Sequence, residues 1–497
     1  MNQREPQVLA AVDLGSYSFH MVVGRYCHGD IVILDRIREM VRLGAGLNAE
    51  GVISEEAADR ALACLARFRE RLTAMRAGSV RAVGTNTLRR ARRKQNFLVR
   101  AEHALGHPIE VISGIEEARL VYLGAAHSLP ASPGRRLVVD IGGGSTEIVV
   151  GDGLQAGLRE SLYMGCVSIS QAHFPDGAVT KKGFEQARLA ALRELDPVVS
   201  RFRDAGWEVA VGTSGTMRAT GRIAEHLTGE PGIGIAGIEA IRQRMLDVGG
   251  AASSDLPGLS QQRAPVYPGG LAIVAAVFES LGIEQMAVSD GALREGLLYD
   301  LVGRLTDEDA RDRAVRAFQE RFHVDLAQAL RVETTARHLA ASVEGVWEVG
   351  DEESTDLLAW SARLHEVGLD IAHSHHQRHA AYLVGHADLS GFSADEQARL
   401  ALLVGAHRRK IDSRLFKKLE APWKARLPRL LALLRLGVLL HRSRSPQPLP
   451  PLRLKAGPHK IKLRFPPGWL ELHPLTAADL KQERSWLKAL DLQLDYK

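Results

Sequence analysis

Two glycine-rich turns, each preceded by an aspartate, are the residues of this sequence best suited to chemistry. In LVVDIGGGSTEIVVGD, Asp140 ends an apolar run and is followed by Gly142, Gly143, Gly144 and Ser145. The backbone amides of such a turn can bind phosphoryl oxygens, and a carboxylate beside them can hold a divalent cation or its waters. For this one string, an ordinary glycine-rich β-turn is an equal alternative.

A second copy of the pattern lies near the start of the chain, in VLAAVDLGSYSFHMVVGRY. Here Asp13 ends an apolar run, and Gly15 and Ser16 follow it. A third string, VAVGTSGTMR at 209–218, has a strand that runs into another glycine-containing turn. Two such hairpins with a later strand-to-helix turn resemble the actin-like, sugar-kinase and Hsp70 ATPase superfamily. We therefore expect two related lobes that face one phosphate site.

Charged side chains near these turns extend the candidate site. Glu117, in SGIEEAR, follows an expected strand at the start of a helix, where it could face the second hairpin. The alternative is the general preference of helix N-termini for acidic residues. Glu147 lies on the strand after the second turn and could equally face solvent. Arg89, in TNTLRRARRK, could hold phosphate oxygens or be a surface charge on a basic helix.

The elements expected around these residues form an α/β region followed by a helical region. Residues 1–122 and 123–304 alternate strands with helices, such as an amphipathic helix over 55–75. Residues 305–390 have helical patterns, and 391–497 combine helices with short strands expected over 460–465 and 469–473. The fold class predicted is α/β: two actin-like, ribonuclease H-like lobes, a helical domain and a small C-terminal α+β region.

Positive charge is concentrated in one part of the chain, whose formal net charge is +5. Residues 401–464 contain 17 Lys or Arg and only two acidic residues, Asp412 and Glu420. Nucleic acid, acidic lipid and a phosphate polymer all fit this charge, and a solvated basic face is the plain alternative. Because aromatic residues make up 5% of the chain and no RNA-binding signature is present, we expect no nucleic-acid partner.

Cysteine usage and hydropathy point to a reducing compartment and no membrane span. The three cysteines are scattered, which does not suit a disulfide framework. No run approaches the roughly 20 apolar residues of a span, and the longest, 430–440, contains Arg435 and is expected to pack in a core. We expect a cytoplasmic protein, with peripheral contact to the inner face of the cell membrane left open.

Taken together, these strings resemble the exopolyphosphatase/guanosine pentaphosphate phosphohydrolase family. The matching strings are AVDLGSYSFHMVV, AVGTNTLRRA, EVISGIEEARLVYLG, LVVDIGGGSTEIVVGD, GTSGTMRA, YPGGLAI and SDGALREGLLYD. LHEVGLDI, RHAAYLV and LLRLGVLL resemble the helical C-terminal half of that family, so the resemblance spans about residues 8–440. One departure is Tyr17, which stands where the family usually has Asn.

The resemblance implies a homodimeric hydrolase that releases orthophosphate from the end of inorganic polyphosphate, processively. Guanosine pentaphosphate is the rival substrate. Glu117 would be the base, Asp13 and Asp140 would be partners of Mg²⁺ with Glu147 a weaker one, and a monovalent cation such as K⁺ could take part. The terminal phosphate would lie against Arg89 and the two turns: Gly15, Ser16, Gly142, Gly143, Gly144 and Ser145. The third turn, 212–215, is expected to be structural.

Histidines of the helical region resemble those of metal-dependent phosphohydrolase domains of the HD type. The set is His338, His365-Glu366, His379 and His407. Glu366 stands where those domains have Asp, and their closing Asp position falls on His441. Because two ligand positions differ, we expect structural histidines in an HD-like domain rather than a second metal site. Outside hydrolases, an actin-like kinase lacks a sugar-pocket signature here, and a non-catalytic polyanion-binding protein remains an alternative.

Overall fold

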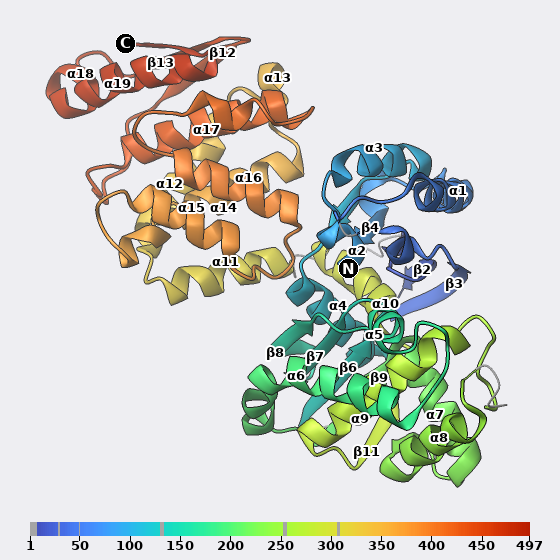
Figure 1. Cartoon of the computed structure of the whole chain (residues 1–497). Coiled ribbons are helices and arrows are strands. Elements are labelled where there is room, and N and C mark those ends of the chain that lie inside the picture. The colour runs from blue at the N-terminus through green and yellow to red at the C-terminus, as the bar shows by residue number, and fades with distance from the viewer. Residues whose placement is uncertain (1–6, 28–29, 49, 130–133, 252–255, 306–308) are drawn as a thin grey trace. The chain divides into compact units, whose positions relative to one another are not determined.

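The computed structural model describes residues 7–27, 30–48, 50–129, 134–251, 256–305 and 309–497. These residues divide into two compact units, Met1–Asp309 and Ala310–Lys497 (Figure 1). The first unit contains both glycine-rich turns, and the second contains the region rich in Lys and Arg.

The first unit is built from two sheets with the same plan. The sheet of lobe I has the strand order β3-β2-β1-β4-β5, and that of lobe II has the order β10-β11-β9-β6-β7-β8. In each lobe an antiparallel hairpin, β1–β2 or β6–β7, pairs in parallel with a later strand, β4 or β9. The predicted pair of related lobes is confirmed. The strands are β1 (Gln7–Leu14), β2 (Phe19–Cys27), β3 (Asp30–Glu39), β4 (Val80–Gly84), β5 (Ile109–Val111), β6 (Arg135–Ile141), β7 (Thr146–Asp152), β8 (Gln155–Leu162), β9 (Val209–Thr213), β10 (Ile233–Gly234) and β11 (Gln285–Val288).

The central residues of the first strand of each hairpin are apolar because both faces of the strand are covered. On β6, Leu137 and Val139 pack into the outer core of lobe II, whereas Val138 packs into a core shared by the two lobes. On β1, Ala10 and Leu9 divide between the outer core of lobe I and the shared core in the same way. A strand buried on both faces has no polar alternation, and only its last residues reach the site.

Helices cover both sides of each sheet. Lobe I is covered on its outer face by α1 (Glu55–Leu72) and α3 (Lys94–Leu105), with the short α2 (Asn86–Arg90) between them in sequence. The helices of lobe II are α5 (Cys166–His173), α6 (Lys181–Ala205), α7 (Ser214–Thr228), α8 (Ile235–Val248) and α9 (Tyr267–Leu281). The segment Ala264–Leu281 is long and apolar enough for a membrane span, but 78% of it is buried, as suits a core helix of lobe II.

Two helices, α4 (Gly114–Ser128) and α10 (Leu293–Leu305), contribute the shared core between the sheets (Figure 1). They approach closely because Gly296 faces the carbonyl oxygen of Leu120, where an added Cβ would clash. Beside this crossing, Asp300 of α10 accepts hydrogen bonds from Arg81 and Arg119 in a buried network. The predicted lobe boundary at residue 122 falls inside α4, so the chain passes between lobes within a helix.

The second unit is helical and ends in a three-stranded sheet, β12-β13-β14. One hydrophobic core runs from Val315 to Leu494, across the predicted boundary at residue 390. Residues 391–497 therefore share the core of the preceding helices. The elements are α11 (Ala310–Arg321), α12 (Leu326–Ala341), α13 (Glu344–Trp347), α14 (Glu352–Leu364), α15 (His376–His386), α16 (Ala394–Ala406), α17 (Trp423–Leu440), β12 (Arg453–Gly457), β13 (Lys460–Arg464), α18 (Trp469–Leu472), α19 (Pro474–Leu487) and β14 (Gln493–Tyr496).

Two sequence predictions for the second unit have different outcomes. The apolar run 430–440 lies in α17 and packs in the core, as predicted, and its buried Arg435 is paired with Glu483 at 2.5 Å. The strand predicted over 469–473 is wrong, because Trp469–Leu472 forms the short helix α18. Trp469 stacks on His473 four residues later, with ring centroids 3.9 Å apart, and this spacing belongs to a helical turn.

Candidate active site

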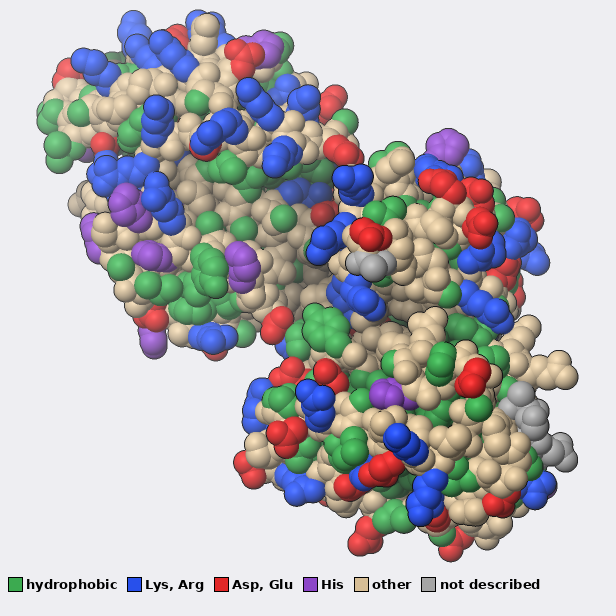
Figure 2. All heavy atoms as spheres, viewed as in Figure 1, with side chains coloured by type: hydrophobic (Ala, Val, Ile, Leu, Met, Phe, Trp, Pro, Cys, Tyr) green, Lys and Arg blue, Asp and Glu red, His purple; other side chains and the backbone are tan. Residues whose placement is uncertain are grey.

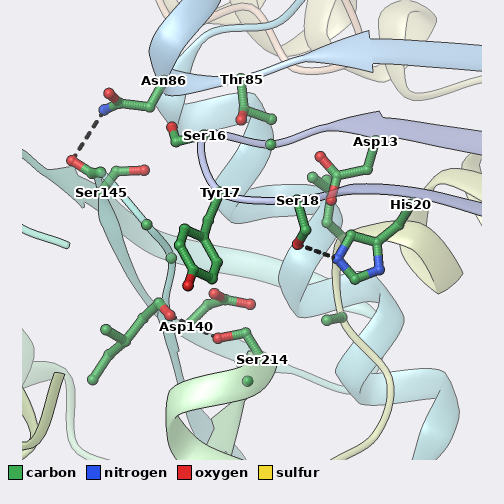
Figure 3. Close-up of a pocket in the computed structure, with 18 of the residues that line it drawn as sticks. Asp13, Ser16, Tyr17, Ser18, His20, Thr85, Asn86, Asp140, Ser145 and Ser214 are labelled. Carbon is green, nitrogen blue, oxygen red and sulfur yellow. Dashed lines mark hydrogen bonds between the residues drawn. The ribbon is translucent and has the colours of Figure 1, made fainter. Parts of the chain in front are cut away.

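The β1–β2 and β6–β7 turns face each other at a cavity of about 130 Å³ (Figure 3). A Cβ built on Gly143 would lie 3.3 Å from Ser16 Cβ, so the two turns are in contact distance. Asn86 Nδ2 donates to the carbonyl oxygen of Gly144 at 3.2 Å, and Thr87 Oγ1 donates to Ser16 Oγ at 2.8 Å. The Asn86 bond fastens lobe I to the turn of lobe II, and the Thr87 bond holds the turn of lobe I to the same helix, α2.

Most of the predicted site residues line this cavity. The predicted residues in its wall are Asp13, Gly15, Ser16, Glu117, Asp140, Gly142, Gly143, Gly144 and Ser145. Arg89 and Glu147 are not part of the wall. Gly15 is required sterically, since an added Cβ would lie 2.8 Å from the carbonyl oxygen of Ser18. The structure thus brings the two predicted turns and three of the predicted carboxylates to one cavity.

Asp13 and Asp140 occupy matching places at the ends of β1 and β6. Asp13 Oδ1 is buried and has no hydrogen-bond partner among the described residues. Burial raises the pKa of Asp13 to about 7, opposed by Arg294 and assisted by Glu117. Asp140 accepts a hydrogen bond from Thr213 Oγ1 at 2.7 Å. Burial raises the pKa of Asp140, and this hydrogen bond partly opposes the rise.

Glu117 lies in the first turn of α4, which begins after Ser113. Ser113 Oγ accepts a hydrogen bond from the backbone N–H of Glu116, as its position predicts for a helix cap. Arg89 Nη1 donates to Glu117 Oε2 at 2.6 Å. Burial raises the pKa of Glu117, and the Arg89 guanidinium lowers it. Arg89 thus contacts the carboxylate, and its predicted role in phosphate binding stays a prediction.

Glu147 lies behind the cavity on β7 and is 1% exposed. Its Oε1 accepts a hydrogen bond from Ser161 at 2.8 Å. Burial and the neighbouring Glu117 carboxylate raise its pKa well above the ordinary value. Four carboxyl groups therefore share a poorly hydrated region, which favours either protonation or a cation.

The donor set fits a hard divalent cation such as Mg²⁺. Mg²⁺ prefers carboxylate oxygens, keeps several waters and commonly shares substrate phosphates rather than an all-protein cage. The uncompensated Oδ1 of Asp13, with Asp140 near the end of β6, supplies such oxygens. Within the described part of the chain, no group of three or more His, Cys, Asp or Glu residues forms a ready metal site. Water and phosphate oxygens would complete the coordination.

Four arginines in the cavity wall were missed by the sequence analysis: Arg38, Arg218, Arg263 and Arg294. Burial lowers the pKa of Arg38 and of Arg218, and the neighbouring guanidinium groups lower it further. So much positive charge in one cavity favours a ligand with several negative charges. Arg218 and Arg294 belong to strings already noted, GTSGTMRA and SDGALREG, whereas nothing in the sequence near Arg38 indicates its position.

Two further polar residues shape the cavity. His20 on β2 contacts Ser18 and Arg294, and burial together with the arginines lowers its pKa well below the ordinary value. Ser214, in the third turn, has a left-handed backbone with φ of 67° and donates to the carbonyl oxygen of Ile141 at 2.8 Å. Such strain is typical of functional sites. The third turn, expected to be only structural, therefore contributes Ser214 and Gly215 to the cavity wall.

A second, larger cavity of about 550 Å³ adjoins the first, and Ser16 and Tyr17 line both. Its wall includes Phe174, Val167 and the carboxylate-bearing Asp176. Tyr17, the residue that departs from the expected Asn, donates a short hydrogen bond through its hydroxyl to the carbonyl oxygen of Gln262. Tyr17 thus lies in the wall of both cavities and joins lobe I to lobe II.

In the second unit, three of the histidines lie together. The rings of His365 and His376 lie 5.2 and 5.4 Å from that of His407, and all three are buried. His338 is exposed elsewhere on α12, and His441 contacts Thr335 at 2.7 Å. Burial lowers the pKa of His365 and of His407, so these rings are neutral near pH 7.

Two sheets of one plan, with a hairpin of each at one cavity, define an actin-like two-lobed protein. The family model for the Ppx/GppA phosphatase family matches residues 22–305, and the model for domain III of the same family matches residues 310–484. The chain belongs to the Ppx/GppA phosphatase family, whose members are hydrolases. The predicted family resemblance is confirmed.

Solved structures of this fold agree with that assignment. The chain is similar to the Aquifex aeolicus member of the Ppx/GppA family, with 25% identity and a TM-score of 0.52, over 61% of this chain and 98% of the other. It also shares its fold with an exopolyphosphatase from Cytophaga hutchinsonii, with 23% identity and a TM-score of 0.55, over 60% and 98% of the two chains.

Proposed function

We propose that this protein is an exopolyphosphatase, which hydrolyses the terminal phosphoanhydride bond of inorganic polyphosphate and releases orthophosphate. The observation that carries the proposal is the cavity where two glycine-rich turns meet three carboxyl groups and four arginines. A chain of phosphates carries charge on every unit, so the arginines would bind the phosphates behind the one that is cleaved.

Glu117 is the proposed base. A phosphoryl group in transfer needs a water in line with the leaving oxygen and a group that orients that water. Glu117 reaches the cavity from α4, opposite the β6–β7 turn, and Arg89 holds its carboxylate in one orientation. A pKa raised by burial brings this carboxylate closer to the pH at which a general base works best.

The two turns would hold the terminal phosphate. The N–H groups and hydroxyls of Gly15-Ser16 and Gly142 to Ser145 would donate to its oxygens, which stabilises charge as the bond breaks. Asp13 and Asp140, with Glu147 behind them, would hold Mg²⁺, which when bound neutralises charge on the phosphoryl oxygens. The buried Oδ1 of Asp13 supports this assignment.

The second unit offers a surface for the rest of a long chain. On the outer face of the terminal sheet, Lys455 on β12 pairs across the strands with Lys462 on β13, and Arg453 pairs with Arg464. Asp495 on β14 lies beside Lys462 and forms an ion pair with Arg464 at 3.4 Å, so it offsets only part of the positive charge. Like charges directly opposite each other destabilise a sheet, so a bound polyanion would relieve the remaining repulsion. Lys and Arg side chains gather over the part of this unit that carries β12 and β13 (Figure 2). Binding there would support processive release.

A second candidate substrate is guanosine pentaphosphate. The cavity of about 550 Å³ beside the phosphate site is within the range of small-molecule sites. Its aromatic residues Tyr17 and Phe174 could contact a base, which polyphosphate lacks. This candidate predicts the same chemistry at Glu117 with a nucleoside held in the larger cavity.

Phosphate release from long polyphosphate and from guanosine pentaphosphate, each with Mg²⁺, tests the proposal. We expect wild-type protein to act on polyphosphate with the higher kcat/KM, and Glu117→Gln to lower kcat roughly 100- to 10,000-fold with little change in KM. Glu116→Gln is unsuitable as a control, because Glu116 pairs with Arg119 at 2.7 Å in the buried network. Glu56→Gln, at an exposed position of α1, is the matched control and should be unchanged.

Three outcomes would contradict the proposal. Undiminished turnover in Glu117→Gln would remove the base assignment. A preference for guanosine pentaphosphate would favour the second candidate. Binding of polyphosphate without any phosphate release would support a non-catalytic polyanion-binding protein.

A further inference from the structure

His20 and Ser18 form a hydrogen-bonded pair in the cavity wall (Figure 3). His20 Nε2 lies 2.7 Å from Ser18 Oγ. Its other ring nitrogen, Nδ1, lies 2.6 Å from a guanidinium nitrogen of Arg294 on α10. At first sight a serine beside a histidine resembles a nucleophile beside its base.

Arg294 reverses the direction of the hydrogen bonds that such a nucleophile and base would need. An arginine can only donate hydrogen bonds, so the Nδ1 of His20 must accept from Arg294. A neutral imidazole then carries its one hydrogen on Nε2, and Nε2–H donates to Ser18 Oγ. In a nucleophilic triad the third residue is a carboxylate, which accepts from Nδ1 and leaves Nε2 free to take the proton of the serine. With Arg294 in that place, His20 cannot deprotonate Ser18.

Because Ser18 Oγ accepts from His20, the hydroxyl hydrogen of Ser18 must point away from the His20 ring. Ser18 Oγ has no other hydrogen bond to a described residue, and Ser18 lines the cavity together with Gly15 and Asp13. A hydroxyl that accepts one bond from a fixed donor has its own hydrogen restricted to the remaining directions. A donor fixed in this way loses little freedom when an anion arrives.

We propose that His20 is a positioning residue that, held by Arg294, orients the Ser18 hydroxyl as a hydrogen-bond donor to a phosphoryl oxygen of the substrate. This inference rests on the proposed function, because it needs a phosphate in the cavity. Ser18 would touch the substrate, and His20 would act through Ser18. The bond is made to bound substrate and transition state alike, so its loss should raise KM more than it lowers kcat.

The kinetic test compares Ser18→Ala, His20→Phe, His20→Gln and the double variant Ser18→Ala/His20→Phe on polyphosphate. We expect each of the first two to raise KM about tenfold, and the double variant to be no worse than either, since both remove one hydrogen bond. Glutamine can accept from Arg294 and donate to Ser18, so His20→Gln should recover most of the loss. Multiplying effects in the double variant, or a His20→Gln as impaired as His20→Phe, would overturn the proposal.

A second measurement does not depend on activity. In ¹⁵N-histidine spectra of the substrate-free protein, assigned by the signal that His20→Gln removes, His20 should be the neutral Nε2–H tautomer at pH 7. An Nδ1–H tautomer or an imidazolium would overturn the proposal, and so would a phosphoserine at Ser18 trapped by acid quench. If the wild-type protein hydrolysed no phosphoanhydride, the proposed function would fail while the tautomer result would still stand on its own.

Discussion

At the scale of single residues, the three carboxyl groups of the cavity wall and the nearby Glu147 are buried, which disfavours their ionised forms in the folded protein. Burial raises the pKa of Asp13, Asp140, Glu117 and Glu147, each by a different balance with its neighbours. A shift in this direction means that ionisation of these groups opposes folding. Binding of a cation would offset the free-energy cost of ionising these carboxyl groups, so ligands should stabilise the folded site.

Replacement of Asp13 by Asn should therefore stabilise the protein while it impairs catalysis. The folded pKa of Asp13 is about 7, above the ordinary value of 3.8, so its stabilising contribution is complete below pH 3.8 and is lost as the pH rises through 7. At pH 8 without Mg²⁺, Asp13→Asn should be more stable by about 2 kcal/mol, below the limit of the full shift because water screens the charge. Thermal unfolding at pH 5 and pH 8 measures this.

The gain should be smaller at pH 5, and Mg²⁺ should raise the Tm of wild type more than that of the variant. Equal gains at both pH values would show that ionisation of Asp13 is not the cause.

Arg89 gives a prediction about the pH profile. The Arg89 guanidinium lowers the pKa of Glu117, so Arg89→Met should let that pKa rise. The base would then become protonated at a higher pH. The acid limb of kcat/KM against pH should move up by about one unit, with activity lost at a pH where wild type is still active.

Arg90→Met, on the exposed neighbour, is the control and should leave the profile where it is. An unchanged acid limb in Arg89→Met would separate Glu117 from the ionisation that limits the rate.

At the scale of elements, the site depends on how closely two hairpin turns approach. The turns touch through glycines, and α2 ties them by Asn86 and Thr87. This short helix follows β4, the strand next to β1. The sheet that carries Asp13 on β1 therefore also positions the helix whose hydrogen bonds hold the two turns.

An added methyl group in the lobe II turn should disturb this approach. A Cβ on Gly144 would lie 2.8 Å from Asn86 Oδ1. Gly144→Ala should therefore push the turns apart and raise KM for polyphosphate about tenfold or more, with a small loss of stability. Steady-state phosphate release measures it, and Gly78→Ala, whose Cβ would meet nothing within 4 Å, is the matched control. A normal KM in Gly144→Ala would mean that the turns separate freely.

Sequence patterns predicted the helices and strands better than they predicted which side chains meet in the folded protein. The duplicated strand–Asp–Gly pattern predicted two hairpins because buried strands and glycine turns are local signals, whereas the arginines of the cavity come from four separate elements. Arg38 lies on β3, whose outward residues look like any exposed strand, and its approach to Arg263 depends on tertiary packing. The strand expected over 469–473 failed because Gly468, in a left-handed conformation, starts a helix there instead.

At the scale of the whole molecule, the proposed function gives a long polyphosphate chain two places to bind, one on each unit. The cavity of the first unit has a volume of about 130 Å³ and is lined by the two turns, and one face of the terminal sheet of the second unit carries Arg453, Lys455, Lys462 and Arg464. Attachment of one polymer to two sites raises its affinity without a new contact at either. Long chains should therefore depend on the second surface and short ones should not.

Charge reversal on β13 tests this dependence. Lys460→Glu/Lys462→Glu should raise KM for long polyphosphate severalfold and leave a short oligophosphate unaffected, and added salt should shrink the difference. Because Lys462 lies between Lys455 on β12 and Asp495 on β14, its change to Glu would replace one like-charge pair by another, and the stability of the sheet should change little. Lys181→Glu/Lys182→Glu, an exposed pair at the start of α6, is the control. Equal effects on long and short chains would contradict the proposal.

The pairing of matched aspartates, one from each sheet, has a kinetic consequence. The proposed phosphate donors are divided between the turns of the two lobes, and α4 and α10 contribute the core between the two sheets. A rotation of one lobe about these helices would change the distance between the two turns. Turnover should then be proportional to the fraction of time that the two turns lie close together. A crosslink between the two turns would be expected to trap the product in the cavity.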